Sequence, residues 1–219
     1  LEKILSYVVK GVMPPTTETN LLGLGKWRVE NTSLGMDGQD FYSVGESVFD
    51  GSGFHWLIPT RIEATGKNIS LNLGALADFG MKYATLMPDE SDPYYAEQQA
   101  ATLAEVQKLK ALIEKNGLSK LNFDSNFGWN WNADSGDAKL DIGLASKDLL
   151  DVSAKYEGAF PNFNAISPTF PDKGEPNFMA LAQVFQTNSS LKIIELNTKD
   201  NGGLTKIFGI IGETGAMGA

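Results

Sequence analysis

The sequence predicts an α+β fold: an antiparallel β-meander sheet with one face covered by helices. Apolar and polar residues alternate with period two in three successive segments, 121–131, 140–144 and 150–156. This period is typical of strands that bury one face. Strand-like segments also come in blocks separated by helical segments, which favours α+β over alternating α/β. The length of 219 residues suits one domain, 1–219.

The most regular strand pattern lies in segment 121–131. Its odd positions include Phe123, Phe127, Trp129 and Trp131, and its even positions are Asn, Asp or Gly. Residues 133–137 (Ala-Asp-Ser-Gly-Asp) have turn chemistry, and the next two segments resume the alternation. Three one-sided strands in succession predict an antiparallel meander.

The N-terminal half begins with an amphipathic helical pattern over residues 1–12, ended by two prolines. Strands are predicted to start near Trp27 and Tyr42. A third run over residues 54–64 contains Pro59, which indicates an edge position or a bulge. Residues 66–68 (Gly-Lys-Asn) are expected to break this run before one more short strand.

Helical segments are predicted after the first strand block, before the last strand and at the end of the chain. Residues 74–87 form one, and a longer one begins at Asp92-Pro93, an N-cap with proline at the first helical position. After a Pro-rich loop over 161–176, we expect a helix from Phe178, a strand over 191–198 and a last helix. Segments 21–117 and 118–219 thus resemble two degenerate strand-block-plus-helix repeats.

Composition excludes several classes of partner. The net charge is −9 and Lys and Arg are scattered singly, so a nucleic-acid partner is not expected. There is no cysteine, and no apolar run approaches the ~20 residues of a membrane-spanning helix. The chain starts at Leu1, not Met, and we expect a processed or truncated product.

No stretch of the sequence identifies a reaction, and we expect no enzyme activity, cofactor or metal. His55 is the single histidine and is expected to face solvent from a strand. The weakest functional alternative is a hydrolase using carboxylates such as Asp124, Asp141 and Asp151. All three are interpreted as residues on solvent-exposed faces of strands.

The aromatic stripe Phe123, Phe127, Trp129 and Trp131 admits two interpretations. Such a stripe is usually core beneath a helix. Alternatively, it lines a groove for a lipid tail or another apolar ligand. These four residues are the candidate ligand-binding residues of the chain.

Three segments carry a resemblance to a known family: residues 58–62 (Ile-Pro-Thr-Arg-Ile), the strand 121–131 with its Asp-rich turn, and residues 191–204, which end in Lys-Asp-Asn-Gly-Gly-Leu. Together they resemble the YdgA-like and, more distantly, the AsmA-like families of Gram-negative envelope proteins. The resemblance implies a periplasmic or envelope location, repeated meander-plus-helix units and no assigned activity.

The sequence therefore predicts a non-enzymatic domain that binds a lipid-like ligand or an envelope protein partner. The alternative is a structural or interaction module whose exposed strand edges pair with a neighbour.

Overall fold

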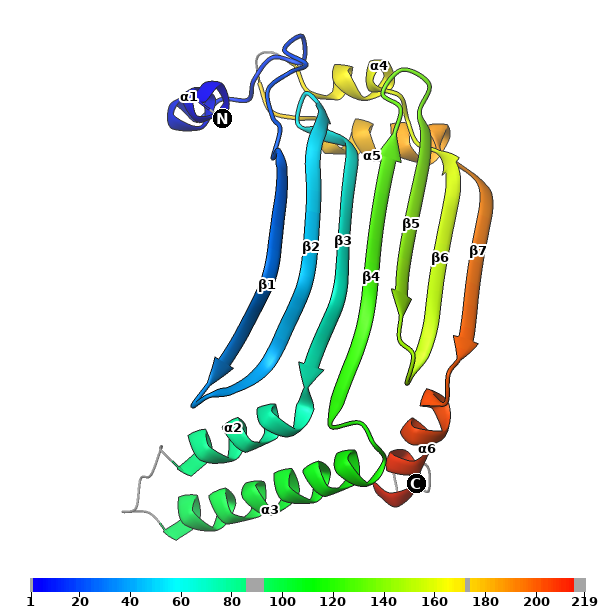
Figure 1. Cartoon of the computed structure of the whole chain (residues 1–219). Helices are drawn as coiled ribbons and strands as arrows, with labels where there is room; N and C mark the ends of the chain where they lie inside the picture. Colours follow the sequence, from blue (N-terminus) through cyan, green and yellow to red (C-terminus); the bar gives the residue numbers. More distant parts are fainter. Residues whose placement is uncertain (1, 86–92, 172–173, 215–219) are drawn as a thin grey trace.

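The molecule is organised around one antiparallel sheet whose seven strands follow chain order from β1 to β7 (Figure 1). The computed structural model describes residues 2–85, 93–171 and 174–214. The predicted α+β fold with a meander sheet is confirmed. The strands are β1 (Lys26–Met36), β2 (Gln39–His55), β3 (Ile58–Asn72), β4 (Lys120–Trp131), β5 (Asp137–Ala145), β6 (Leu150–Ala159) and β7 (Ser190–Asp200).

The helices gather at the two ends of the strands (Figure 1). One end carries α1 (Glu2–Lys10), α4 (Phe163–Ile166), the 3-10 turn η1 (Ser167–Thr169) and α5 (Phe178–Asn188). The other end carries α2 (Leu73–Thr85), α3 (Pro93–Lys115) and α6 (Gly203–Thr214). The helical cover expected over one face is thus confined to the strand ends, and the middle of the sheet stays open.

Strand register sorts the side chains into two faces, because directly paired residues point to the same side of a sheet. One row across the strands is wholly apolar: Trp27, Phe49, Ala64, Phe127, Ile142, Ala154 and Leu196. The row beside it on the opposite face runs Lys26, Asp50, Glu63, Gly128, Asp141, Lys155 and Glu195. We call the side that bears the first row the apolar face.

The packed core occupies one end of the apolar face. Its buried members are Leu21, Trp56, Trp131, Ala138, Phe163 and Ile166, and residues of α1 and α5 pack against them. Away from this end Val44 and Ile69 are buried, but other large apolar residues of the face are exposed. Trp27 is 63% exposed and Leu196 is 69% exposed. An exposed apolar surface that continues across strands is a feature of binding sites.

Two local predictions in the first strand block were wrong. The run 54–64 is not one strand: β2 ends at His55, and residues 56–57 form a two-residue hairpin turn in which Trp56 has a φ of 57°. Residues 66–68 do not end a strand, because β3 continues through them with a bulge in its pairing to β4. At this bulge the Asn68 N–H donates to Oδ1 of Asp124 at 2.7 Å.

For Pro59 the sequence predicts either an edge position or a bulge, and the structure agrees with the bulge. Pro59 does not lie at a sheet edge, since β3 is paired on both sides. Its partner Phe54 adjoins a register shift in β2, which is the bulge alternative.

The predicted helices are present at their expected places. Asp92, the expected N-cap of the long helix, lies outside the described residues. The Pro-rich segment 161–176 contains α4 and η1, which the sequence did not predict. At the start of the last helix, Asp200 Oδ1 accepts the N–H groups of Gly202 and Leu204.

Candidate ligand-binding pocket

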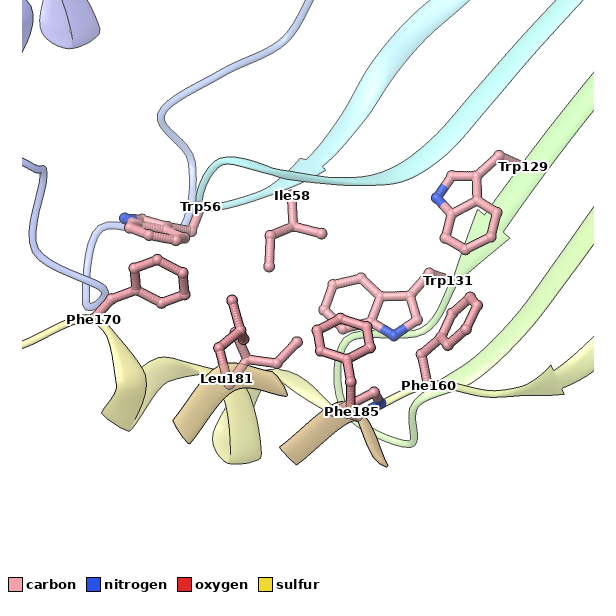
Figure 2. A pocket seen from close by; sticks show the side chains of 10 residues that line it. Trp56, Ile58, Trp129, Trp131, Phe160, Phe170, Leu181 and Phe185 are labelled. Carbon is pink, nitrogen blue, oxygen red and sulfur yellow. The ribbon is translucent and has the colours of Figure 1, made fainter. Parts of the chain in front are cut away.

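A pocket of about 350 Å³ lies at the core end of the apolar face (Figure 2). Its wall combines the β2–β3 hairpin, the end of β4, the segment after β6, and α4 and α5. Among the residues that the structure describes, no charged side chain lines it. The lining residues are Trp56, Ile58, Trp129, Trp131, Phe160, Pro161, Ile166, Phe170, Leu181 and Phe185.

Local structure explains how three tryptophans reach one pocket. Trp129 and Trp131 are two residues apart on β4, so strand alternation places both on the apolar face. Trp56 comes from the hairpin turn, where its positive φ is a rare conformation for a bulky residue. Its side chain is only 2% exposed, so burial of the indole offsets that backbone strain.

The three indole N–H groups are satisfied differently. Trp56 Nε1 donates to the Pro14 carbonyl oxygen at 3.2 Å, and Trp129 Nε1 donates to the Pro59 carbonyl oxygen at 2.9 Å. Trp131 is 3% exposed, and its Nε1 has no hydrogen-bond partner among the described residues.

Ring contacts hold the wall together. The ring centroid of Phe160 lies 5.7 Å from that of Trp129 and 6.2 Å from that of Phe185, which joins β4 to α5. At the opposite side, the centroids of Trp56 and Phe170 are 4.9 Å apart. These separations are typical of favourable aromatic pairs.

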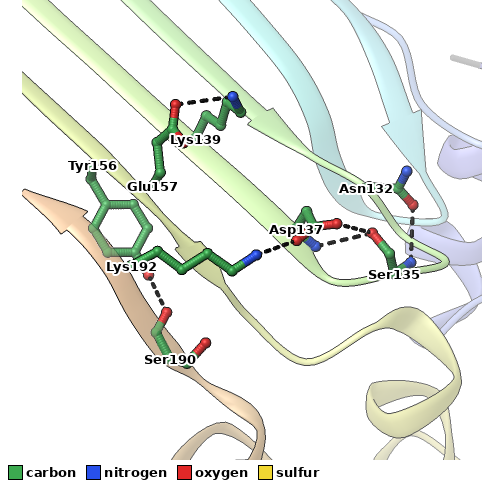
Figure 3. A network of polar contacts seen from close by, with 8 residues as sticks. All are labelled: Asn132, Ser135, Asp137, Lys139, Tyr156, Glu157, Ser190 and Lys192. Atoms are coloured by element: carbon green, nitrogen blue, oxygen red, sulfur yellow. Dashed lines mark hydrogen bonds and ion pairs between the residues drawn. The ribbon is translucent and has the colours of Figure 1, made fainter.

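A polar network supports the same wall from the β4–β5 turn (Figure 3). The turn is closed by Asn132, whose Oδ1 accepts the N–H groups of Asp134 and Ser135. Within this turn, the Gly136 carbonyl accepts the N–H of Phe160 at 2.8 Å, which fixes the backbone of a pocket residue.

Asp137 links this turn to the edge strand β7. Its carboxylate lies 2.8 Å from Lys192 Nζ and 2.8 Å from Ser135 Oγ. The hydrogen bond from Lys192, followed by that from Ser135, holds the pKa of Asp137 below its ordinary value. The same contact raises the pKa of Lys192.

A second cavity, a groove of about 400 Å³, lies in the middle of the sheet. Its apolar lining includes Val44, Ile69, Phe127, Ile142 and Leu144. Because Phe127 precedes the pocket residue Trp129 by two positions on β4, the groove and the pocket are neighbours, about 7 Å apart along the strand. We call the pocket and the neighbouring groove together the apolar track.

The four candidate residues take different places along this track. Trp129 and Trp131 line the pocket, and Phe127 lines the groove. Phe123 is half-buried, pairs with Ile69 of β3, and lines neither cavity. All four share the apolar face.

Most of the pocket wall lies outside the stripe that the sequence singled out. Trp56 and Ile58 sit around an unpredicted hairpin, and Phe160 and Phe170 flank the Pro-rich segment. Phe160 and Phe170 could have been suspected from the sequence, because isolated aromatic side chains beside a Pro-rich segment are stabilised by burial. Leu181 and Phe185 lie on a predicted helix, but its docking position is a tertiary property.

The structure does not bring the three carboxylates of the hydrolase alternative together. Asp124 and Asp151 lie on one row, separated by Ala145, and Asp141 is four residues further along β5. Asp124 accepts the Asn68 N–H, and Asp151 Oδ1 accepts from Ser146 N and Asn201 Nδ2. These contacts are those of turn and bulge support.

His55 does not face solvent as expected. It is half-buried, and its ring packs edge-on against Phe163 with centroids 4.3 Å apart. Within the described ranges, no group of three or more His, Asp or Glu side chains is placed to hold a metal ion.

No protein-family model, curated protein or solved structure matches this chain. Over the part of the chain that is described, no helix is long and apolar enough to cross a membrane.

Proposed function

We propose that this chain is a lipid-binding domain that holds an apolar chain along the apolar face of its sheet. The observation that carries the proposal is the apolar track, in which a pocket with no charged residue in its described lining lies beside a groove on the same face of the sheet. Ligand sites are typically concave, mostly apolar and of this size.

The charge pattern supports a ligand that lies on one side of the sheet. One row of the opposite face carries charged side chains, which favour contact with water: Asp50, Glu63, Asp141 and Lys155. The apolar face instead exposes large side chains such as Ile142 and Leu196. Covering them with an acyl chain removes apolar surface from water at roughly 25 cal/mol per Å².

The first test is to identify what the protein retains. Gentle purification, native mass spectrometry and organic extraction should reveal a reproducible added mass that extracts as lipid. A bare polypeptide mass would shift the proposal toward a protein partner on the apolar face.

A charge placed in the groove gives the second test. Phe127→Glu puts a carboxylate on the apolar face, and Asn130→Glu puts the same group on the exposed opposite face of the same strand. Delipidated Phe127→Glu should bind a fluorescent acyl probe at least about tenfold more weakly than wild type, a loss of 1.4 kcal/mol. Asn130→Glu should bind normally, and equal losses would contradict the proposed site.

One observation favours a second candidate function, a module that pairs through its strand edges. Strands β1 and β7 are the terminal strands of the sheet, and the outer edge of each has no paired strand among the described residues. Such edges pair readily with another strand. Concentration-dependent association in sedimentation experiments would support this candidate, and a lipid-free monomer at high concentration would oppose it.

The periplasmic or envelope location implied by the resemblance to the YdgA-like family belongs to the same proposal. Cell fractionation of the natural host tests it directly, with the chain expected in the periplasmic or envelope fraction.

A further inference from the structure

The indole N–H of Trp131 is a buried donor that has no acceptor among the described residues. Trp131 lines the pocket, and no described residue of the lining offers its N–H an acceptor. Leaving a buried donor unsatisfied is unfavourable, so native structures seldom do so without a reason.

The neighbouring tryptophans show that this part of the fold can satisfy an indole. Trp56 and Trp129 line the same pocket, and each donates to a backbone carbonyl oxygen behind the wall. The unpaired state of Trp131 is therefore specific to its position. In Figure 2 its ring lies beside those of Phe160 and Phe185.

We infer that the pocket receives a neutral acyl ester whose carbonyl oxygen accepts the Trp131 Nε1–H. This inference rests on the proposed lipid-binding function and specifies the ligand class. An ester supplies both an apolar chain for the aromatic wall and one oxygen acceptor for the indole. A free carboxylate fits less well, because none of the described lining residues is a cation that could pair with a buried negative charge.

Ligand entry requires a small rearrangement. Trp131 Nε1 has almost no exposed surface, so an oxygen atom reaches it only after a neighbouring ring moves. Phe185 on α5 is 39% exposed and therefore has room to turn. The inference requires that a movement of this kind uncovers the indole nitrogen.

Indole NMR provides a direct test on the full chain. The chain has four tryptophans, and Trp131→Phe assigns one of the four indole N–H signals. Delipidated protein is titrated with a fatty acid methyl ester and, in parallel, with an alkane of matched length. The ester should move the Trp131 signal downfield, as a new hydrogen bond does, whereas the alkane should not.

Affinity ratios separate the inference from the proposed function. Wild type should bind the ester about fivefold more tightly relative to the alkane than Trp131→Phe does, the equivalent of one hydrogen bond. The control is Trp129→Phe, which removes an indole N–H that already has an acceptor. It should weaken both ligands alike and keep the wild-type ratio.

Each outcome has one meaning. If neither ligand binds wild type, the proposed function itself fails. If both bind but the Trp131 signal does not respond to the ester, or Trp131→Phe keeps the wild-type ratio, the ester inference is overturned and the binding function stands. If Trp131→Phe folds poorly, Trp27→Phe, Trp56→Phe and Trp129→Phe identify the other three indole signals, so the titration of wild type still decides the matter.

Discussion

The indole nitrogen of Trp129 donates a 2.9 Å hydrogen bond to the carbonyl oxygen of Pro59, which ties β4 to the start of β3. Trp131, two residues further along the same strand, has no equivalent bond. The two side chains share one face, yet Trp129 is anchored to the sheet and Trp131 donates to no residue that the structure describes.

Trp129→Phe and Trp131→Phe should therefore differ in stability. Both variants lose the same ring volume, but only Trp129→Phe takes the indole hydrogen bond away from the carbonyl oxygen of the half-buried Pro59. We expect its free energy of unfolding to fall by about 1–3 kcal/mol, and that of Trp131→Phe to fall by less. Urea unfolding of the ligand-free proteins measures both, and a larger loss for Trp131→Phe would contradict the assignment.

Gly136 should be far less tolerant of alanine than Gly38. Both glycines have positive φ, 82° and 78°, so alanine strains both backbones. At Gly136 the added Cβ would also collide with the Phe160 carbonyl oxygen, whereas at Gly38 it meets open space. Gly136→Ala should cost about 1–3 kcal/mol more than Gly38→Ala by thermal or urea unfolding.

The same pair tests the link between turn and pocket. Because Phe160 forms part of the pocket wall, Gly136→Ala should also weaken acyl-probe binding. Gly38→Ala lies in the β1–β2 turn and should leave binding unchanged. Normal binding by a folded Gly136→Ala protein would show that the turn does not position the wall.

Ile166→Ala tests the packed end of the sheet. Ile166 is 3% exposed within the core cluster, so its truncation should lower the free energy of unfolding by about 2–5 kcal/mol. Met179→Ala on α5 is the control, because Met179 is 83% exposed and should change stability by about 0.5 kcal/mol or less. Similar losses of unfolding free energy in the two variants would show that Ile166 does not belong to the core.

Asp137 gives a pH-dependent prediction. Its pKa is lowered in the folded protein by the hydrogen bond from Lys192, so the charged carboxylate stabilises the fold above its unfolded pKa, about 3.9. That contribution is lost as the pH falls through the lowered folded value.

Lys192→Met should raise the pKa of Asp137 toward the ordinary value, although Ser135 still donates to the carboxylate. Carboxyl-detected NMR titration measures this directly, and amide exchange of β7 should quicken because the edge strand loses a tether. Both effects should shrink at high salt, since the pair is exposed. An unchanged Asp137 pKa in Lys192→Met would contradict the assignment.

Alternation was sufficient to predict the second strand block. Segment 121–131 became β4 almost to the residue, because its period of two continues without interruption and Trp131 ends it before a turn sequence. The same signal misled at residues 54–64, where apolar alternation runs straight through the Trp56 turn. A Trp at positive φ has no sequence signature, since its burial depends on the distant Pro14 carbonyl and on Phe170.

The bulge in β3 shows the reverse error. Residues 66–68 have the composition of a turn, but Asp124 of β4 accepts the Asn68 N–H and keeps the strand paired through them. Likewise, the sequence proposed Trp129 and Trp131 for a groove but had no means to join them to Phe185. Contacts between segments so far apart in the chain are set by tertiary packing.

The strand order has a consequence for biosynthesis. Every strand pairs with its sequence neighbour, so β1, β2 and β3 have their partners as soon as they leave the ribosome. The outer edge of β3 must then wait, unpaired, while α2 and α3 are translated before β4 arrives. Since Phe185 lies closer to the C-terminus than the rest of the wall, the pocket is completed late in translation. A nascent chain stalled after α3 should therefore be the species that most needs a chaperone.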